Sequence, residues 1–407
     1  MFAYNETPSS SVRLNLVAQR THAIQQSAIC EMTRLSEAKQ AINLGEGLPD
    51  FAPDALIQAQ VMEALQSDSL LHQQQNTWGR ASLREALATW YGQRYQLTLD
   101  PDKHITATVG ASEGLYVALA AVTNPGDEII VLEPFFESYK TIFHLLEVTP
   151  VYITLPFPTF ELDVEQVKAV LTPRTKALLL NTPNNPTGSV LSLETLTALA
   201  QLAQQHQFYI ISDEVYSELT YDGHAHTPMA TLEGMDSWAI TTSSVSKNYS
   251  ATGWRVGWVI ANATVTDAIR KVHDVTTAGT NGYFQEATAR VLALPPSYYD
   301  GLRADYHHRR DAMEALLRAL GFNPIRPQGA YYFWTDTEPL RHLGHDDLSV
   351  VKGLIEQYGI SNVPGRCFFR ANAAEAGVST HYLRWCFAKK LSTLHTAMDW
   401  VQASNGK

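Results

Sequence analysis

Residues 241–258, "TTSSVSKNYSATGWRVGW", hold a single lysine, Lys247, among small and hydroxyl-bearing residues, and Arg255 follows eight positions later. The runs that flank the lysine, "SWAITTSS" (237–244) and "WRVGWVIA" (254–261), have the β-branched and apolar character of strands. The stretch therefore predicts a polar turn between two strands, with a lysine and an arginine at the edge of a sheet.

Further strand-like runs alternate with longer helical patterns on the N-terminal side of this stretch. They are "KHITATV", "DEIIVLE", "TPVYITL", "TKALLLN" and "FYIISDE", which begin at residues 103, 127, 149, 175 and 208. Strands that alternate with helices form a mostly parallel sheet covered on both faces. We therefore predict an α/β fold with a large domain over residues 55–295.

A second, smaller α/β domain is expected over residues 296–407, joined by part of the N-terminal arm, residues 1–54. "LPPSYYD" breaks the chain near residue 295, and a long amphipathic helix follows. Its apolar stripe comprises Leu302, Tyr306, Met313, Leu316, Leu317 and Leu320. The charged run on the same helix is expected to face solvent and comprises His307, His308, Arg309 and Arg310.

Composition excludes some partners. The 407 residues carry a net charge of -11, which argues against nucleic acid or an anionic membrane as the main partner. Cys30, Cys367 and Cys386 show no C-x-x-C spacing, so we expect reduced thiols and no metal site. The first residues lack the apolar core of a signal peptide, and no apolar run approaches the roughly 18 residues that span a membrane. We expect a cytoplasmic protein.

Polar clusters follow several of the predicted strands, where open α/β sheets bind their ligands. "GAS" opens a helix after "KHITATV", so amides near Ala111 and Ser112 can hold a phosphate. A lysine that forms a Schiff base with a carbonyl cofactor becomes a catalytic amine. Pyridoxal phosphate needs such a lysine and an acidic partner for its ring nitrogen. Lys247 and Asp213, in "SDEVY", suit these roles, and Tyr216 could hydrogen-bond the ring oxygen.

"SVSKNYSATGWRVG" resembles the lysine signature of class I and II pyridoxal-phosphate aminotransferases. "INLGEGLPDF", "GRASLREAL", "PGDEIIVLEPFFESY", "NTPNNPTG" and "DEVY" resemble further blocks of that family, in the family's order. The resemblance runs from about residue 42 to 388 and is nearest the kynurenine, glutamine and methionine aminotransferases. It implies fold type I, with a mostly parallel seven-stranded sheet, and a homodimer with shared active sites.

The resemblance also assigns roles. Lys247 would bond to the cofactor and move the proton, and Asp213 would pair with the ring nitrogen. Phe136 would stack on the ring, with Phe135 as the alternative, while Asn185 and Tyr216 would hold the ring oxygen. The phosphate ligands would be Ala111, Ser112, Ser244 and Arg255. The substrate carboxylate would meet Arg384 and Asn185, at a wall where a side chain on Gly47 would obstruct the substrate.

Some features leave alternatives open. Five residues before Gly79, where the family carries a tyrosine that reaches the partner's cofactor phosphate, this chain has Gln74. A pyridoxal-phosphate lyase or cyclase acting on a β- or γ-substituted amino acid is therefore an alternative to an aminotransferase. A regulator with an aminotransferase-like domain is a distant third.

The donor is expected to be an aromatic amino acid, methionine or glutamine, and the acceptor a 2-oxo acid. No arginine is placed to meet a second carboxylate of the substrate. Phe136, Tyr139, Trp254 and Tyr283 are expected near the site and favour an apolar side chain. His224 and His226 have no nearby acidic or thiol partner in the sequence, so a metal site there is not expected.

Overall fold

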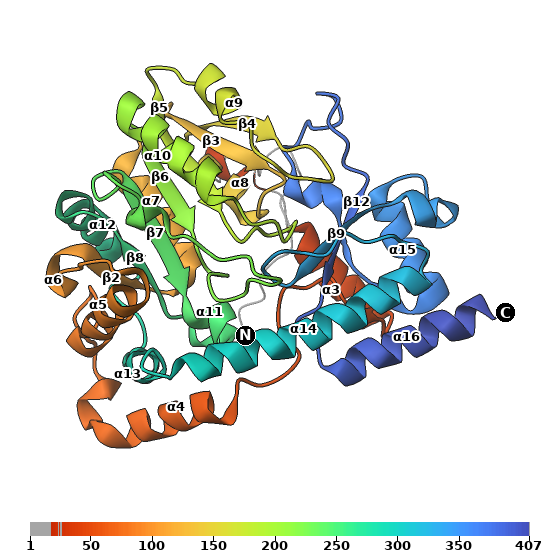
Figure 1. Ribbon diagram of the computed structural model, residues 1–407, viewed down its shortest axis with the longest axis horizontal. Coiled ribbons are helices and arrows are strands. Elements are labelled where there is room, and N and C mark those ends of the chain that lie inside the picture. The colour runs from red at the N-terminus through yellow and green to blue at the C-terminus, as the bar shows by residue number, and fades with distance from the viewer. Residues whose placement is uncertain (1–17, 23, 25–26, 407) are drawn as a thin grey trace, which may run out of the picture.

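The computed structural model describes residues 18–22, 24 and 27–406, and a seven-stranded sheet forms its centre (Figure 1). The spatial order is β2-β8-β7-β6-β5-β3-β4. The strands are β2 Ile105–Thr108, β3 Glu128–Glu133, β4 Thr149–Thr154, β5 Thr175–Asn181, β6 Tyr209–Asp213, β7 Ala239–Ser244 and β8 Gly257–Ile260. Each of the seven runs named from the sequence contains one of these strands, which confirms the predicted fold class.

One strand runs against the others. β8 is antiparallel to both neighbours, β2 and β7, whereas the pairs from β7 through β4 are parallel. Only residues 245–256 separate β7 from β8, a length at the lower limit of about a dozen residues that a parallel crossover needs. The carboxyl ends of the parallel strands and the amino end of β8 therefore meet at one edge of the sheet.

Helices pack on both faces of this sheet (Figure 1). Alternate residues of β3 point to opposite sides: Ile130 joins a core with α10, and Ile129 joins a core with α7. Burial on both faces explains why strands such as β3 and β5 read as nearly continuous apolar runs. The helices of this part of the chain are α4 Ala55–Ser67, α5 Ala81–Tyr95, α6 Pro101–His104, α7 Gly110–Val122, α8 Ser138–Leu146, α9 Val164–Ala169, α10 Leu193–His206, α11 Val245–Asn248, α12 Ala263–Thr276 and α13 Gly282–Val291.

The C-terminal part contains a second, three-stranded sheet, ordered β11-β12-β9. A short parallel pair, β1 with β10, ties the N-terminal segment to this part of the chain. We keep the division at residues 54 and 295 as a proposal. The elements are α2 Gln19–His22, α3 Ala28–Ala38, β1 Ile42–Asn43, α14 Pro296–Ala319, β9 Tyr332–Asp336, α15 Asp347–Tyr358, β10 Ile360–Ser361, β11 Val363–Pro364, β12 Tyr382–Cys386 and α16 Leu391–Asn405.

The long helix α14 buries most of its predicted apolar stripe, with Leu302 half-buried. The prediction of a solvated face is wrong at Arg310, and the Arg309 side chain is only 13% exposed. The Arg310 side chain is 0% exposed, and Nη1 and Nη2 donate to the Asp222 carboxylate at 2.6 and 3.0 Å. Its guanidinium also lies over the Tyr221 ring, 4.8 Å from the centre. A buried guanidinium is tolerated here because a carboxylate pairs with it.

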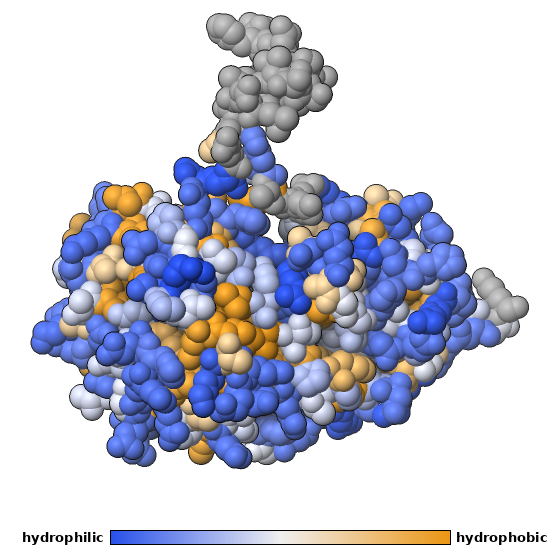
Figure 2. Space-filling model, turned by 90° about the horizontal axis from the view of Figure 1, so that it is seen from above, coloured by the Kyte–Doolittle hydropathy of each residue, from blue (hydrophilic) through white to orange (hydrophobic). Residues whose placement is uncertain are grey.

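Seen from above, the surface is mostly hydrophilic, with apolar residues gathered near its middle (Figure 2). In the part of the chain that the structure describes, no helix is both long enough and apolar enough to cross a bilayer.

Candidate active site

A cavity of about 480 Å³ lies at the edge where the strand ends meet. It draws on turns after β2, β3, β5, β6 and β7, on the segment after β1 and on β12. All the site residues named from the sequence line it: Gly47, Ala111, Ser112, Phe136, Asn185, Asp213, Tyr216, Ser244, Lys247, Arg255 and Arg384. Residues more than 300 positions apart in the sequence thus line one cavity. The role of each residue in it is a proposal.

Lys247 lies in α11, directly after β7, and lines the cavity. Its Nζ donates a hydrogen bond to the Gly47 carbonyl oxygen at 3.0 Å and lies 5.4 Å from the centre of the Tyr331 ring. Burial lowers the pKa of Lys247 to about 8, and the positive charges of Arg384 and Arg255 act in the same direction. A lysine with this pKa is partly neutral near pH 8 and can act as a nucleophile or a base.

Asp213 ends β6 and is buried. The Tyr139 hydroxyl donates to its Oδ2 at 2.7 Å, whereas Oδ1 has no hydrogen-bond partner among the described residues. Burial raises the pKa of Asp213 to about 6, although the hydrogen bond from Tyr139 opposes the rise. A buried carboxylate oxygen without a donor is costly, so Oδ1 suits a ligand that brings an N–H group into the cavity.

Backbone amides, hydroxyls and one guanidinium meet where α7 begins. Gly110 opens that helix with a φ of 71°, and a Cβ there would lie 2.3 Å from Nη2 of Arg255. Ser112 lies in the same first turn, and Ser244 forms the N-cap of α11, where its Oγ accepts from the Ser246 amide. A helix N-terminus beside hydroxyls and an arginine suits a phosphate group.

Arg384, on β12, is 1% exposed and fixed on both sides. Nη1 donates to Asn185 Oδ1 and Nη2 to the Gly45 carbonyl, each at 2.8 Å, and the guanidinium carbon lies 4.4 Å from the centre of the Tyr332 ring. Its Nε has no hydrogen-bond partner within the described part of the chain. A buried guanidinium that keeps a donor free is suited to a carboxylate ligand and is not a solvated strand charge.

Residues 46–48 form one wall of the cavity, and side chains outside the cavity donate hydrogen bonds to their carbonyl oxygens. Tyr331 donates to the Gly47 carbonyl at 2.8 Å, and Lys389 Nζ donates to the two neighbouring carbonyls at 3.2 and 2.9 Å. A Cβ on Gly47 would lie 2.2 Å from the Tyr332 hydroxyl oxygen. This packing against a tyrosine requires glycine before any substrate is bound, which differs from the reason drawn from the sequence.

Of the two adjacent phenylalanines, Phe136 lines the cavity. Phe135 is 2% exposed and stacks on Tyr152 in the core, with ring centres 5.7 Å apart. Trp254 and Tyr283, which the sequence placed near the site, do not line the cavity. The aromatic residues in the lining are Phe136 and Tyr216, which motifs indicate, and Tyr332, which no motif indicates.

Tyr332 lines the cavity although no motif points to it, and Asn181, the first residue of the "NTPNNPTG" block, lines it although it was not named among the site residues. The Tyr332 and Tyr216 hydroxyl oxygens lie 3.0 Å apart. Asn181 Nδ2 donates to the Asp213 carbonyl at 3.0 Å, and its Oδ1 accepts from the Asn185 amide at 2.7 Å. For Tyr332, the one sequence signal was the tyrosine pair near the start of "GAYYFWTD".

A larger cavity, of about 720 Å³, contains none of the predicted site residues. It lies between the end of α5, the segment after β6 and α14, and both His224 and His226 line it. His226 Nε2 lies 3.1 Å from a carboxylate oxygen of Glu214, so an acidic neighbour is present that the sequence did not suggest. Among the described residues, no group of three or more ligating side chains could hold a metal ion.

Comparison with known proteins connects this geometry to a family. The model of "Aminotransferase class I and II" matches residues 39–399. Kynurenine–oxoglutarate transaminase 1 of Homo sapiens is 34% identical over 94% of this chain and 97% of the human protein. A probable N-succinyldiaminopimelate aminotransferase of Mycobacterium tuberculosis is 32% identical over 94% of this chain and 97% of its own length.

A solved structure extends the likeness to the fold. YbdL from Escherichia coli, whose structure and reactivity identify a methionine aminotransferase function, superimposes with a TM-score of 0.88 at 30% identity. The match covers 95% of this chain and all of the bacterial one. The fold-type-I architecture and the resemblance seen in the sequence are thereby confirmed.

Proposed function

We propose, from the premise that this chain belongs to the class I and II aminotransferase family, that its cavity takes an aromatic amino acid, methionine or glutamine as donor. The chain is a pyridoxal-phosphate-dependent aminotransferase that passes the amino group to a 2-oxo acid. The main support for the proposed site is that Lys247, Asp213 and Arg384 line the same cavity. The similar proteins are aminotransferases, which does not favour a lyase or cyclase.

The residues present fit pyridoxal phosphate. Asp213 Oδ1 is a buried acceptor with no donor among the residues that the structure describes, which suits a protonated ring nitrogen. Phe136 would lie against the ring, and Asn185 and Tyr216 would hold its oxygen. The phosphate would be held by Ala111, Ser112, Ser244 and Arg255. When bound, the cofactor supplies a carbonyl that captures the substrate amine and a ring that withdraws electrons from Cα.

The amino-acid substrate would be held by its carboxylate at Arg384, which fixes Cα relative to Lys247. Lys247 would take the proton from Cα as the free amine and return it as the ammonium. The Gly47 carbonyl, 3.0 Å from Nζ, orients the amine in this exchange. Asp213, held by Tyr139, would stay ionised opposite the ring nitrogen.

The preferred donor can be inferred from whether the cavity has a cation that is not already assigned to the cofactor or to the substrate α-carboxylate. Lys247, Arg255 and Arg384 are the lysines and arginines in its described lining, and each has a proposed role. No cation is left there for a second substrate carboxylate, and Glu46 and Glu137 line the cavity instead. A dicarboxylic donor such as aspartate is therefore disfavoured, and the apolar lining near Phe136 favours an apolar side chain.

We further propose a cytoplasmic homodimer with shared active sites. Support comes from apolar side chains exposed between residues 48 and 78, including Leu70 at 67% and Met62 at 58%. Such side chains are commonly covered in a dimer. Gln74 is exposed and lies outside the cavity of its own chain, where Nε2 donates to the Ala278 carbonyl at 3.3 Å. In a dimer it would approach the partner subunit's cofactor phosphate.

The test of the proposed function is a half-reaction. Protein loaded with pyridoxal phosphate is mixed with glutamine, methionine, phenylalanine, tryptophan, kynurenine, arginine or aspartate, without an oxo acid, and the products are identified by mass. We expect stoichiometric oxo acid and pyridoxamine phosphate from an apolar or amide donor. Aspartate should have a kcat/KM lower by about tenfold or more, equivalent to ~1.4 kcal/mol. Ammonia or an eliminated product in catalytic amounts would contradict transamination.

Replacing Tyr139 with phenylalanine should lower kcat about tenfold, because a hydrogen bond to a charged group contributes roughly 1.5–3 kcal/mol. The Tyr139 hydrogen bond lowers the pKa of Asp213, so its loss should raise that pKa. Activity that needs the ionised carboxylate should then disappear at a higher pH as the pH falls. The kcat–pH profile tests this, with Tyr152→Phe, which alters another tyrosine of the same aromatic group, as the control. Superimposable profiles would rule out the role of Tyr139.

A further inference from the structure

His273, on α12, is 0% exposed, and both of its ring nitrogens face hydrogen-bond acceptors. Nδ1 lies 2.7 Å from a carboxylate oxygen of Glu113, and Nε2 lies 2.7 Å from the Thr77 carbonyl oxygen. A neutral imidazole carries one N–H, whereas the protonated ring carries two. Both contacts can be donated by His273 only if the ring is positively charged.

The surroundings of His273 favour that charge. Burial opposes it, but the hydrogen bond and the negative charge of Glu113 outweigh burial, and the pKa of His273 is raised. Burial likewise opposes ionisation of Glu113, but hydrogen bonds from His273 and Thr277 lower its pKa. The other charged group acting on the ring is Asp274, next along α12. The ion pair therefore forms in the pH range between the lowered pKa of Glu113 and the raised pKa of His273, and it is lost as the pH falls through the first or rises through the second.

Glu113 belongs to the first turn of α7, the turn that presents Ala111 and Ser112 to the cavity. Its second carboxylate oxygen accepts from the Val109 amide at 2.5 Å, so the side chain folds back over the start of its own helix. The pair of Glu113 and His273 therefore holds the first turn of α7, which carries the proposed phosphate ligands Ala111 and Ser112, in position.

The same pair reaches Arg255 through the end of α12. The Thr277 hydroxyl donates to Glu113 Oε1 at 2.6 Å. Three residues on, the Thr280 hydroxyl donates to the Arg255 carbonyl at 2.9 Å. Arg255 has a φ of 55°, a left-handed conformation that a non-glycine residue keeps only when its surroundings hold it. Support of its backbone by this segment is therefore needed.

His273 also anchors residues 76–79 through the Thr77 carbonyl. This segment lies against β2, because the Ala107 amide donates to the Trp78 carbonyl at 2.9 Å. A Cβ on Gly79 would lie 2.4 Å from the Ala107 Cβ. β2 leads directly into the first turn of α7, so His273 joins the two segments that flank the proposed phosphate site.

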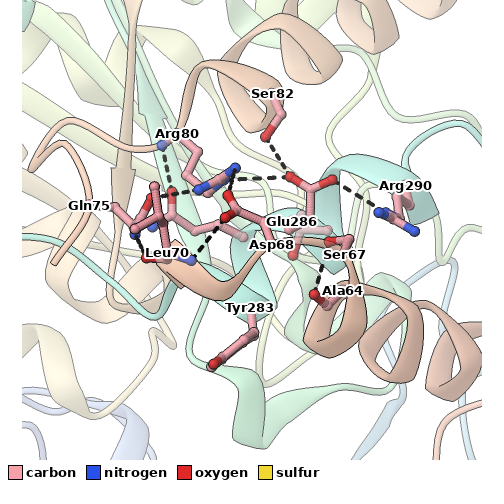
Figure 3. A network of polar contacts seen from close by, with 12 residues as sticks. Ala64, Ser67, Asp68, Leu70, Gln75, Arg80, Ser82, Tyr283, Glu286 and Arg290 are labelled. Atoms are coloured by element: carbon pink, nitrogen blue, oxygen red, sulfur yellow. Dashed lines mark hydrogen bonds and ion pairs between the residues drawn. The ribbon is translucent and has the colours of Figure 1, made fainter. Parts of the chain in front are cut away.

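The far end of this segment has its own anchor. Figure 3 shows Arg80 between Asp68, Gln75 and Glu286. Nη1 donates to Gln75 Oε1 at 2.5 Å, and the ion pairs with Asp68 and Glu286 measure 3.7 and 3.5 Å. These contacts do not involve His273. A change at His273 should therefore loosen residues 76–79 locally without removing the support at Arg80.

We propose that positively charged His273 is a positioning residue for the cofactor phosphate. Paired with Glu113, it sets the spacing between the first turn of α7 and Arg255. It does not touch the phosphate. The inference rests on the proposed assignment of Ala111, Ser112, Ser244 and Arg255 as the phosphate ligands.

The test compares cofactor forms with and without the phosphate. Apo-protein is titrated with pyridoxal phosphate and with pyridoxal, and the ratio of the two affinities is taken. His273→Gln should weaken pyridoxal phosphate binding roughly tenfold, the loss expected for a charge-assisted hydrogen bond, and leave pyridoxal binding unchanged. Glu113→Gln, which keeps the side-chain shape, should lower the ratio in the same way. The control is Lys271→Gln on the same helix, whose side chain is 74% exposed.

The ring itself provides a second measurement. In protein with ¹⁵N-labelled histidine, NMR should show both ring nitrogens of His273 protonated at pH 7, with the signals assigned by their loss in His273→Gln. A neutral ring, an unchanged affinity ratio, or an equal loss for both ligands would overturn the inference. Arg255→Gln serves as the reference. If it lowers the ratio and His273→Gln does not, only the role of His273 fails. If neither lowers it, the phosphate assignment is wrong as well.

Discussion

Replacing Lys247 with alanine should lower kcat/KM by at least about 10⁴-fold, the upper range for loss of a positioned acid–base group. The loss should be this large because one amine serves both as the cofactor's attachment point and as the proton carrier. The other basic side chains in the described lining, Arg255 and Arg384, carry a guanidinium group instead of an amine and cannot replace it. The half-reaction with the best donor measures the effect, and Lys271→Ala, on the exposed face of α12, should retain parental activity.

Two observations would separate lost chemistry from lost structure. Methylamine added to Lys247→Ala should restore part of the activity, and more basic amines of equal size should restore more, as general base catalysis requires. In the parent apo-protein, covalent attachment of pyridoxal phosphate should become faster as the pH rises through about 8, because the neutral amine attacks. Parental activity in Lys247→Ala would exclude the lysine from both roles.

The large sheet could be predicted from the sequence because its strands are buried on both faces. Such strands leave short runs of β-branched and apolar residues, and all seven were found in this way. The direction of β8 could not be read from its composition. It follows from the short link between β7 and β8, whose course depends on how α11 and the turn at Arg255 pack.

The error at Arg310 has a specific cause. In an α-helix, positions 306, 310, 313 and 317 fall on one stripe, and Tyr306, Met313 and Leu317 are buried there. The helical period thus placed Arg310 inside, but the run of four basic residues was interpreted as a solvated face. The carboxylate that makes burial tolerable, Asp222, is 88 residues away in the chain and could not be paired with it in advance.

At the site, residues carried by motifs were predictable and residues brought by packing were not. Asp213, Asn185 and Lys247 follow strands whose ends meet at one edge, so the sheet alone places them together. Tyr332 comes from β9, in a different sheet, and no local pattern sets its distance from Tyr216. The hydrogen bond from Tyr139 to Asp213 likewise depends on how α8 packs beside β6.

Replacing Asp213 with asparagine should be the second most damaging change, lowering kcat roughly 10²–10⁴-fold. Loss of one partner of a buried ion pair costs about 3–5 kcal/mol, and each ~1.4 kcal/mol is a tenfold change in rate. Asparagine keeps the size of the side chain but removes the negative charge that would hold a proton on the ring nitrogen. The change is measured as the single-turnover rate constant with the best donor, together with the affinity of the apo-protein for pyridoxal phosphate. Asp213→Glu, which keeps the charge on a longer side chain, should lose less.

A double-mutant cycle shows whether the charge of Asp213 is what matters. Tyr139 donates a hydrogen bond to Asp213 Oδ2 and packs edge-on against Phe136. Burial raises the pKa of Asp213 to about 6, and this hydrogen bond opposes the rise. If the ionised carboxylate carries the effect, Tyr139→Phe should cost about tenfold in the parent and almost nothing in Asp213→Asn, since the two residues act as one unit. Binding of pyridoxal phosphate to the apo-protein should weaken below about pH 6 in the parent, and this weakening should be absent from Asp213→Asn. Additive losses with an unchanged acid limb would mean that Asp213 supports the cavity by packing and that another group sets the charge opposite the ring nitrogen.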